Sequence, residues 1–400
     1  MTVSDRHGDV IVIGGGLHGC SVALHLARKG LRPIVLEQAH TGRHASGVNA
    51  GGVRRLGRHP AEIPLSVASM KIWLDIAALV GDDCGFHRTG QIKVAENAAD
   101  MEVLAARAKS LRDLGFTHEE PIGRDELRAL VPAVSPHCVG ALISRNDGHA
   151  NPFRTVTAFR LAGEKLGVAV HQGARAERIE RKGDHWTVAT DTGNFEAPVL
   201  VNCAGAWADR VAHQLGEAAP LRVEAPMLMI TERVAPFLRP VIGAASRPLS
   251  FKQFDNGTVL IGGGHRGQAD RDVSTTELNF AGLAVSARTA AEIFPLMSGV
   301  RVIRCWAGIE AVMPDEIPVI GPSATAADAY HAFGFSAHGF PLGPIVGRLL
   351  AELIGRRSGI YRQTRAGGAA GRGCEAGICR SAIARQGCVA QSSARGNQRG

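Results

Sequence analysis

The stretch Asp9-Val-Ile-Val-Ile-Gly-Gly-Gly-Leu-His-Gly-Cys20 decides the expected fold of this chain. Val10 to Ile13 form a continuous apolar run, which is typical of a strand buried on both faces of a parallel sheet. Residues 20–29 then have the apolar spacing of a helix, and residues 31–36 form a second apolar run that ends at Glu37. The order predicts a strand, a glycine-rich turn, a helix and a second strand, which together make a βαβ unit.

The glycines between the first strand and the helix have the spacing of a dinucleotide-binding turn. Gly14 allows the tight turn, Gly16 lets a pyrophosphate approach the backbone, and Gly19 lets helix and strand pack closely. The helix N-terminus would attract the same pyrophosphate. Glu37 is placed to bind ribose hydroxyls, and its charge disfavours the 2′-phosphate of NADP. We therefore predict an FAD or NAD site; a plain structural turn is the alternative.

Composition is that of an ordinary globular enzyme. The 400 residues are 45% hydrophobic and 20% charged, which predicts two or three domains. No apolar run has the length of a membrane span, and the polar N-terminus predicts no signal peptide. The eight cysteines lack a spacing typical of metal sites, so we predict no metal, reduced thiols and a cytoplasmic location.

The formal net charge of +8 is confined to the end of the chain. Residues 356–400 contain nine arginines and one acid, Glu375, while acids and bases balance in the rest. The charge therefore does not predict nucleic-acid binding by the folded part. We expect this Arg/Gly-rich segment to be disordered, because it has little apolar periodicity. A GC-rich gene read in a shifted frame would encode a similar composition.

Three further segments bear on the fold. Residues 38–55 are rich in Gly, Ser and Asn, which predicts either backbone close to a ligand or a mobile surface loop. Residues 199–209 predict a second buried strand, an Ala-Gly turn and a helix, as in a doubly wound sheet. Residues 220–304 predict an antiparallel sheet, in which Gly262-Gly-Gly264 marks a hairpin or bulge, and a helix is expected over 345–354.

Taken together, these motifs resemble the D-amino-acid oxidase family of FAD-dependent amine and amino-acid oxidoreductases, which includes glycine oxidase and monomeric sarcosine oxidase. The resemblance runs from about Val10 to Ile354. The resemblance rests on five motifs: Gly14–Gly19 with Glu37, Ser46–Gly52, Val201–Trp207, Trp306–Gly308 with Pro314–Gly321, and Phe335–Phe340. Within the family, residues 306–315 are most similar to β subunits of bacterial dehydrogenases such as opine oxidase, D-hydroxyproline dehydrogenase and hydrogen cyanide synthase.

The resemblance implies an α/β fold with two domains. The first is a discontinuous Rossmann-like FAD-binding domain of the glutathione-reductase type, formed by residues 8–88, 149–219 and 305–355. The second is an inserted antiparallel-sheet α+β substrate domain, formed by residues 89–148 and 220–304.

The resemblance also implies which residues hold the cofactor. The FAD contacts would be Gly14, Gly16, Leu17, His18, Gly19, Glu37, Gln38, Ser46, Asn49, Ala50, Gly51, Gly52, Ala176, Ala204, Gly205, Trp207, Gly308, His338, Gly339, Phe340, Pro341 and Leu342. Some sarcosine oxidases tether FAD through a cysteine at the position of Gly308. Because Cys305 lies three residues earlier, we expect non-covalent FAD and a buried Cys305 thiol.

Four residues are implied to act on the substrate: Arg54, Arg55, Glu310 and His338. Glycine oxidase-like enzymes bind the substrate carboxylate with an arginine where this chain has Glu310. Arg54 or Arg55 is the replacement candidate, and solvated loop charges are the alternative. Glu310 suggests a cationic substrate group, a partner subunit or a structural ion pair.

The implied reaction is hydride transfer from a substrate C–H beside nitrogen to the flavin, giving an imine that water hydrolyses. The substrate would be a small amine: an amino acid, an imino acid or an opine-type secondary amine. A partner iron–sulfur or flavoprotein subunit would fit the β-subunit likeness; nucleic acid and a membrane span are not expected. The alternatives are an NAD- or quinone-linked reductase and a non-catalytic or electron-relay subunit of a multi-subunit dehydrogenase.

Overall fold

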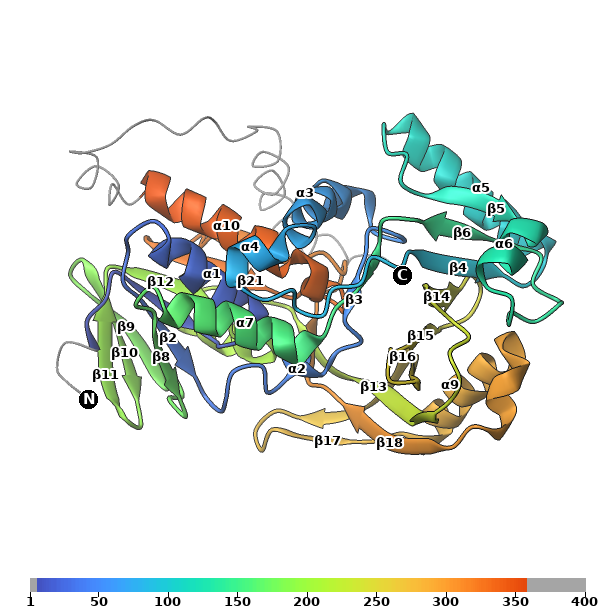
Figure 1. The fold of residues 1–400 in the computed structure, drawn as a ribbon. Coiled ribbons are helices and arrows are strands. Elements are labelled where there is room, and N and C mark those ends of the chain that lie inside the picture. The colour runs from blue at the N-terminus through green and yellow to red at the C-terminus, as the bar shows by residue number, and fades with distance from the viewer. Residues whose placement is uncertain (1–5, 358–400) are drawn as a thin grey trace, which may run out of the picture.

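Val10–Ile13 is the central strand, β1, of a six-stranded sheet in the computed structural model, which describes residues 6–357 (Figure 1). On one side β1 pairs with β2, which pairs with β8; on the other it pairs with β12, followed by β21 and β20. All neighbours are parallel except β20 and β21. The bounds of these five strands are Pro33–Glu37 (β2), Ala169–Gln172 (β8), Val199–Asn202 (β12), Val319–Pro322 (β20) and Ala329–Phe333 (β21).

Both faces of this sheet are covered, which explains the unbroken apolar run in β1. Val10 and Val12 pack against a layer of helices, and Ile11 and Ile13 pack against a three-stranded sheet with a short helix. The helical layer contains α1 (Leu17–Ala27), α3 (Ile63–Trp73), α7 (Pro152–Glu164) and α10 (Gly339–Arg357). The other layer contains β9 (Arg178–Lys182), β10 (His185–Thr190), β11 (Gly193–Ala197) and α8 (Ala208–Gln214).

A second, ten-stranded sheet takes its strands from residues 91–144 and 222–312. Its order is β18-β13-β16-β15-β14-β4-β6-β5, with β17 beside β16 and β19 beside β13. Because β18 pairs with β13, residues 305–307, which were expected in the first domain, belong to this sheet and not to the six-stranded sheet. The bounds are Gln91–Ala95 (β4), Glu120–Gly123 (β5), Gly140–Ser144 (β6), Arg222–Arg233 (β13), Val241–Ala244 (β14), Ser250–Gln253 (β15), Thr258–Asp270 (β16), Thr275–Glu277 (β17), Val302–Ala307 (β18) and Glu310–Val312 (β19).

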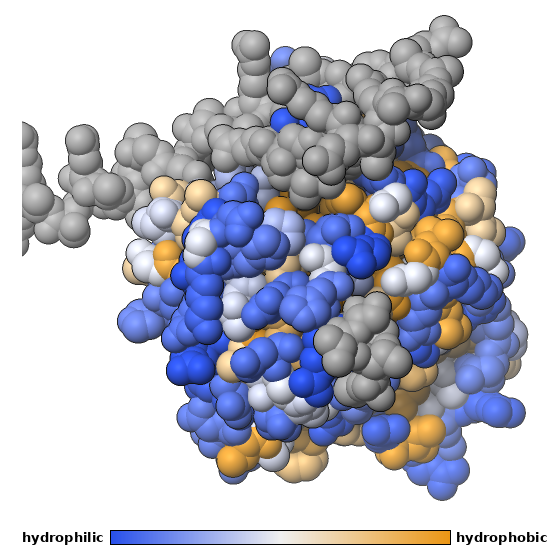
Figure 2. Space-filling model, turned by 90° about the vertical axis from the view of Figure 1, so that its left-hand side faces the viewer, coloured by the Kyte–Doolittle hydropathy of each residue, from blue (hydrophilic) through white to orange (hydrophobic). Residues whose placement is uncertain are grey.

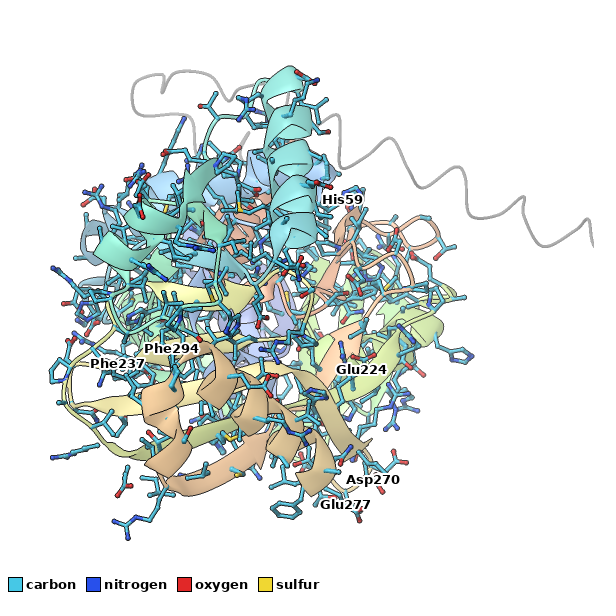
Figure 3. All side chains as sticks on the ribbon, turned by 90° about the vertical axis from the view of Figure 1, so that its right-hand side faces the viewer. His59, Glu224, Phe237, Asp270, Glu277 and Phe294 are labelled. Carbon is cyan, nitrogen blue, oxygen red and sulfur yellow. The ribbon has the colours of Figure 1, made fainter. Side chains whose placement is uncertain are left out.

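Three helices pack on this second sheet: α5 (Ala98–Asp113), α6 (Arg124–Leu130) and α9 (Phe280–Ile293). The core of this sheet contains an aromatic group. Phe251 of β15 stacks on Phe294 with ring centroids 4.6 Å apart, and Phe237 lies 5.8 Å from Phe294. Figure 3 shows Phe237 and Phe294 together on the side of the molecule that carries α9. The second sheet therefore has a hydrophobic core of its own.

Local details differ from the sequence-based expectation where tertiary packing decides. The helix expected over 345–354 begins earlier, at Gly339. Packing on α1 favours the longer helix, because α10 crosses Leu17 and Ser21 of α1 at Gly343 and Gly347, where glycine allows close approach. The segment expected as one loop over 38–55 contains α2 (Ala45–Val48) and β3 (Gly52–Val53), and β3 pairs with β7 (Gly148–His149).

Two further details concern a helix and a glycine cluster. A second short helix, α4 (Ile76–Val80), follows α3 after a break. The Gly262–Gly264 cluster lies within β16 beside a register shift opposite β13, as a bulge would.

The surface seen from the left-hand side of Figure 1 is mainly hydrophilic, with hydrophobic residues in separate patches (Figure 2). Among residues 6–357, no helix combines the length and apolar character that crossing a bilayer requires. The expected disorder of the Arg/Gly-rich segment concerns residues almost all of which lie outside the described part of the chain.

The contact between α1 and α10 gives a direct test of the fold. A Cβ at Gly347 would lie 2.5 Å from the carbonyl carbon of Ser21, whereas a Cβ at Gly299 would meet nothing within 4 Å. Helix propensity alone predicts that Gly347→Ala stabilises the protein by about 1 kcal/mol. We expect instead a loss of about 1–3 kcal/mol, because the two helices must separate. Urea unfolding of Gly347→Ala measures this, with Gly299→Ala as the control; a stabilised Gly347→Ala would contradict the described packing.

Candidate active site

A cavity of about 1120 Å³ lies between the two large sheets. It starts at the carboxyl end of β1, which lies between β2 on one side and β12 on the other, so that the strand order changes direction there. From this point it extends to β4, β14 and β15. Ligands of doubly wound sheets bind at such a switch point. The volume exceeds the roughly 300–1,000 Å³ of ordinary small-ligand pockets. It therefore has room for a dinucleotide beside a second small molecule.

The glycine-rich turn at one end of the cavity has the geometry that its sequence predicts. Gly14 has φ +107°, and a Cβ there would lie 2.3 Å from the carbonyl oxygen of Cys203. A Cβ at Gly19 would lie 1.9 Å from the Gly14 carbonyl oxygen. Gly16 is the N-cap of α1, has no side chain to cap the helix, and lines the cavity together with Leu17 and His18, so the helix N-terminus faces the cavity. Such an arrangement binds a pyrophosphate.

Glu37 and the loop after it complete the nucleotide end. The Glu37 carboxylate accepts hydrogen bonds from the backbone N–H groups of Gly15 (2.8 Å) and Ala39 (2.9 Å), which fix it beside the cavity. Burial raises the pKa of Glu37, and these two hydrogen bonds oppose that rise. Gln38 also lines the cavity. The carboxylate is thus held where a ribose would lie.

The Gly/Ser/Asn-rich segment is packed against the protein, and this favours the ligand-binding alternative over a mobile loop. Ser46 Oγ accepts from the Leu17 N–H at 3.0 Å, and Asn49 Oδ1 accepts from the Gly51 N–H at 2.7 Å. The buried Lys252 ammonium donates to the Ala50 carbonyl at 2.5 Å. Ser46, Asn49, Ala50, Gly51 and Gly52 all line the cavity.

Most other residues expected at the cofactor come from turns that meet at the cavity. Gly14, Gly16, Leu17, His18, Ala176, Ala204, Gly205, Trp207, Gly308, Gly339, Phe340 and Pro341 line it. Gly19, Leu342 and His338 do not. Gly19 serves the packing of α1, Leu342 is fully buried in the core, and His338 Nδ1 lies 3.4 Å from the buried carboxylate of Glu62. The residues present therefore fit a dinucleotide cofactor, with donors and close backbone on the nucleotide side and apolar walls beyond.

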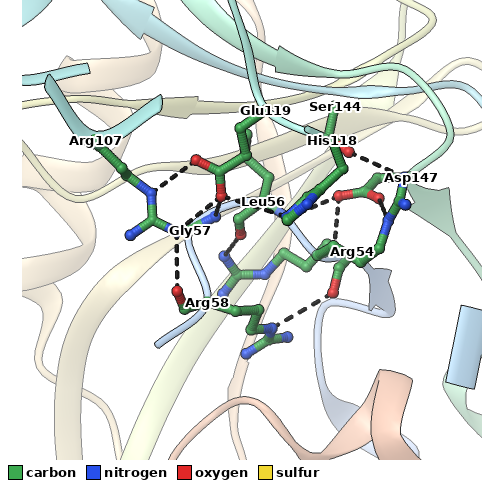
Figure 4. Close-up of polar contacts among 10 residues, drawn as sticks. Arg54, Leu56, Gly57, Arg58, Arg107, His118, Glu119, Ser144 and Asp147 are labelled. Atoms are coloured by element: carbon green, nitrogen blue, oxygen red, sulfur yellow. Dashed lines mark hydrogen bonds and ion pairs between the residues drawn. The ribbon is translucent and has the colours of Figure 1, made fainter. Parts of the chain in front are cut away.

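Of the two candidate arginines, only one lines the cavity. Arg54 lines the cavity, and its Nη1 donates to the Leu56 carbonyl at 3.2 Å (Figure 4). Arg55 does not line it: its Nε donates to Asp147 Oδ1 at 3.0 Å, and its backbone N–H donates to Oδ2 of the same carboxylate. Asp147 is fully buried. Arg55 is therefore occupied within the protein, and Arg54 is the arginine of the pair that can reach a ligand.

Arg58 also lines the cavity, and sequence reasoning missed it. It is 1% exposed, its Nε donates to the Arg54 carbonyl at 3.4 Å, and its Nη1 has no partner within the described chain. Burial, with the neighbouring charge of Arg54, lowers the pKa of Arg58 to about 9. In the sequence it is one arginine in a loop, and only tertiary packing distinguishes it.

Glu310 lines the cavity at the start of β19. Its Oε1 accepts from the Ala337 N–H at 2.7 Å. Burial raises the pKa of Glu310 to about 7; that hydrogen bond and the charge of Arg266 limit the rise, and Glu224 adds to it. Its ionisation therefore changes near neutral pH, as expected of a group that meets a ligand.

The cysteines and possible metal ligands offer no second chemistry among residues 6–357. The five described cysteines are free thiols, and no group of three or more metal-ligating side chains is present in that range. Cys305, expected to be buried, is only half-buried because it lies in β18 at the edge of the second sheet; it does not line the cavity, and its partial burial raises its pKa. Cys203 borders the cavity, but burial raises its pKa even further.

Comparison with known proteins gives one family match and several relatives. The family described as "FAD dependent oxidoreductase" matches residues 9–353. An opine oxidase subunit from Rhizobium meliloti is 28% identical over 325 residues, 79% of this chain and 85% of that protein. Hydrogen cyanide synthase subunit HcnC of Pseudomonas aeruginosa is 27% identical over 395 residues, 88% of this chain and 93% of that protein.

The fold is that of solved structures with lower sequence identity. Glycine oxidase from Geobacillus kaustophilus has a TM-score of 0.81 at 22% identity, over 88% of this chain and 95% of that one. L-proline dehydrogenase from P. horikoshii has a TM-score of 0.81 at 23% identity, over 88% and 94%. These likenesses confirm the expected α/β fold with a Rossmann-like domain.

Gly16 tests the nucleotide end of the cavity. A Cβ there would meet only the Ser46 side chain, at 2.8 Å, so Gly16→Val should fold while its side chain fills the pyrophosphate position. We expect purified Gly16→Val to be soluble and colourless, with loss of the flavin absorption of the wild-type protein. Gly123→Val, at a glycine with open space around it, is the control. Normal flavin content in Gly16→Val would show that the cofactor lies elsewhere.

Proposed function

Because this chain belongs to the family of FAD-dependent oxidoreductases, we propose that it oxidises the C–N bond of an amino acid, an imino acid or an opine-type secondary amine. The observation that carries the proposal is the single cavity that joins the dinucleotide end to an end lined by Arg54, Arg58 and Glu310. When bound, FAD supplies the acceptor for a hydride from the carbon beside nitrogen. The names of opine oxidase and glycine oxidase among the relatives support an amine as substrate.

Arg54 and Glu310 would hold the two ends of such a substrate. Arg54 would bind a carboxylate through its guanidinium, the group best suited to a planar anion. Glu310 lines the same cavity and, when ionised, would face the substrate nitrogen. The apolar side chains of Met227, Leu228 and Ile309 line the same cavity and would keep water from the reacting carbon. Together these residues would orient the substrate, which is the protein's main contribution to a flavin reaction.

We also propose that a partner subunit takes part, and that the protein works in the cytoplasm. Support for a partner comes from the relatives named as subunits of opine oxidase, hydrogen cyanide synthase and sarcosine oxidase. An iron–sulfur or flavoprotein partner would then receive the electrons; oxygen is the other acceptor. The unpaired thiols support a reducing compartment.

The direct test of the reaction is anaerobic. Purified protein mixed without oxygen with amino acids, cyclic imino acids and N-carboxyalkyl amino acids should lose its oxidised flavin absorption with at least one of them. Absence of reduction by every amine, in protein that dithionite does reduce, would support the electron-relay alternative. Non-covalent attachment is checked on the same protein by acid precipitation. FAD should leave with the supernatant, because Cys305 lies off the cavity and burial disfavours the Cys203 thiolate.

A second prediction concerns the pH dependence of substrate binding. Because the pKa of Glu310 is about 7, its carboxyl is neutral below and charged above that pH. If it binds the substrate's cationic nitrogen, the Kd should fall as pH rises from 6 to 8, and by about tenfold in all. Glu310→Gln should bind with a flat profile over this range while its FAD content stays normal. Glu316→Gln, which removes an exposed carboxylate near β19, is the control; the same slope in Glu310→Gln would exclude Glu310 from the site.

A further inference from the structure

Three basic side chains gather at the far end of the cavity, and we call them the basic cluster: Arg54, Arg58 and Lys93. Arg54 and Arg58 come from the loop after β3. Lys93 lies in β4 between the fully buried Ile92 and Val94, and it lines the cavity beside Ile92. Burial lowers the pKa of both Arg58 and Lys93, and the charge of Arg54 lowers it further, so both cations lie within electrostatic reach of Arg54.

Nearby carboxylates do not neutralise the basic cluster, because other groups already hold them (Figure 4). Asp147 accepts from Arg55 and from the backbone N–H groups of Arg55 and Leu56. Glu119 receives two hydrogen bonds from Arg107, at 2.7 and 2.8 Å, and one from the Gly57 N–H. Each of these carboxylates is thus matched by one arginine outside the basic cluster.

Glu62 is the remaining carboxylate within electrostatic reach of Arg54 and Arg58. It is 1% exposed; burial would raise its pKa, but the contact with His338, 3.4 Å away, and the charge of Arg58 hold that pKa below the usual range. Burial lowers the pKa of His338, which keeps that ring neutral near pH 7. One negative charge therefore faces the three positive charges of the basic cluster, and two positive charges are left over in this part of the chain.

Two other arginines that line the cavity, unlike the basic cluster, have carboxylate partners. Arg247 pairs with Glu96 and Glu292, and Arg266 pairs with Glu224. Within residues 6–357, Arg54, Arg58 and Lys93 form no ion pair, and Arg58 keeps a guanidinium nitrogen without any partner. An unpaired buried cation is costly to a folded protein. The cost is offset when a ligand brings the matching charge.

Building on the function proposed above, we propose that the substrate amine carries two carboxylates, and that Arg54, Arg58 and Lys93 bind both. Two guanidiniums offer each carboxylate a planar pair of donors, and the lysine adds a third cation without fixed geometry. A secondary amine with a carboxylate on each nitrogen substituent has this charge pattern. Glu310, elsewhere on the cavity wall, is left for the nitrogen. Arg58 and Lys93 are then specificity-determining residues, since a single carboxylate would leave one positive charge unmatched.

The test compares two secondary amines that differ by one carboxylate: iminodiacetate and sarcosine. Their Kd values are measured on FAD-loaded protein from the change in the oxidised flavin spectrum, without oxygen. Iminodiacetate should bind at least about tenfold more tightly than sarcosine. Arg58→Met and Lys93→Met should each weaken iminodiacetate by about tenfold or more and sarcosine by less. Arg58→Lys, which keeps the charge but not the fork, should fall between wild type and Arg58→Met.

Controls separate this inference from general charge effects and from the proposed reaction. Arg145→Met removes an arginine that pairs with Glu120 and Glu126 away from the cavity, and it should keep the wild-type ratio of Kd values. Because binding is read on oxidised flavin, it stays measurable even if no amine reduces the cofactor. Equal Kd values for both amines in the wild type would overturn the inference. So would an unchanged iminodiacetate Kd in both Arg58→Met and Lys93→Met, or inorganic phosphate binding as tightly as iminodiacetate.

Discussion

The close approach of Gly14 to the carbonyl of Cys203 is the constraint on which the rest of the site depends. At this point the turn after β1 lies against the end of β12, with room for no side chain. Gly19, in the first turn of α1, has no room for a side chain either, because a Cβ there would clash with the Gly14 carbonyl. The two glycines together let α1 begin directly over the sheet. The N-terminus of α1 and the Glu37 carboxylate then face one cavity. Any larger residue at Gly14 or Gly19 would move α1, and with it the α10 helix that packs on it.

A second constraint comes from charge. The loop after β3 carries Arg54, Arg55 and Arg58 into the space between the two sheets, where water cannot solvate all of them. Asp147 binds Arg55 and holds the loop, while Arg54 and Arg58 stay turned to the cavity. The same ion pair thus orders the loop, while the guanidiniums of Arg54 and Arg58 hydrogen-bond only to backbone carbonyls of residues 6–357 and keep donors for a ligand. Such pre-ordering reduces the entropy that binding would otherwise lose.

The parts of this architecture that could be predicted are those with local causes. The βαβ unit follows from an apolar run, three glycines and Glu37, all within 29 residues from Asp9 to Glu37. The role of Arg55 could not be predicted from its neighbours, because its partner Asp147 lies 92 residues away in the sequence. Arg58 and Lys93 carry no local signal, since their burial arises only when the loop and β4 meet. The start of α10 at Gly339 was missed because glycine usually weakens helices, and here its value lies in the contact with α1.

The central claim is that one cavity holds FAD at the glycine-rich turn and an amine beside the basic cluster. A crystal structure of the protein with FAD and iminodiacetate tests it most directly. The account predicts the FAD pyrophosphate at Gly16 and the N-terminus of α1, its ribose at Glu37, and both probe carboxylates within hydrogen-bonding distance of Arg54, Arg58 or Lys93. A flavin outside this cavity, or a probe bound with its carboxylates away from all three cations, would contradict it.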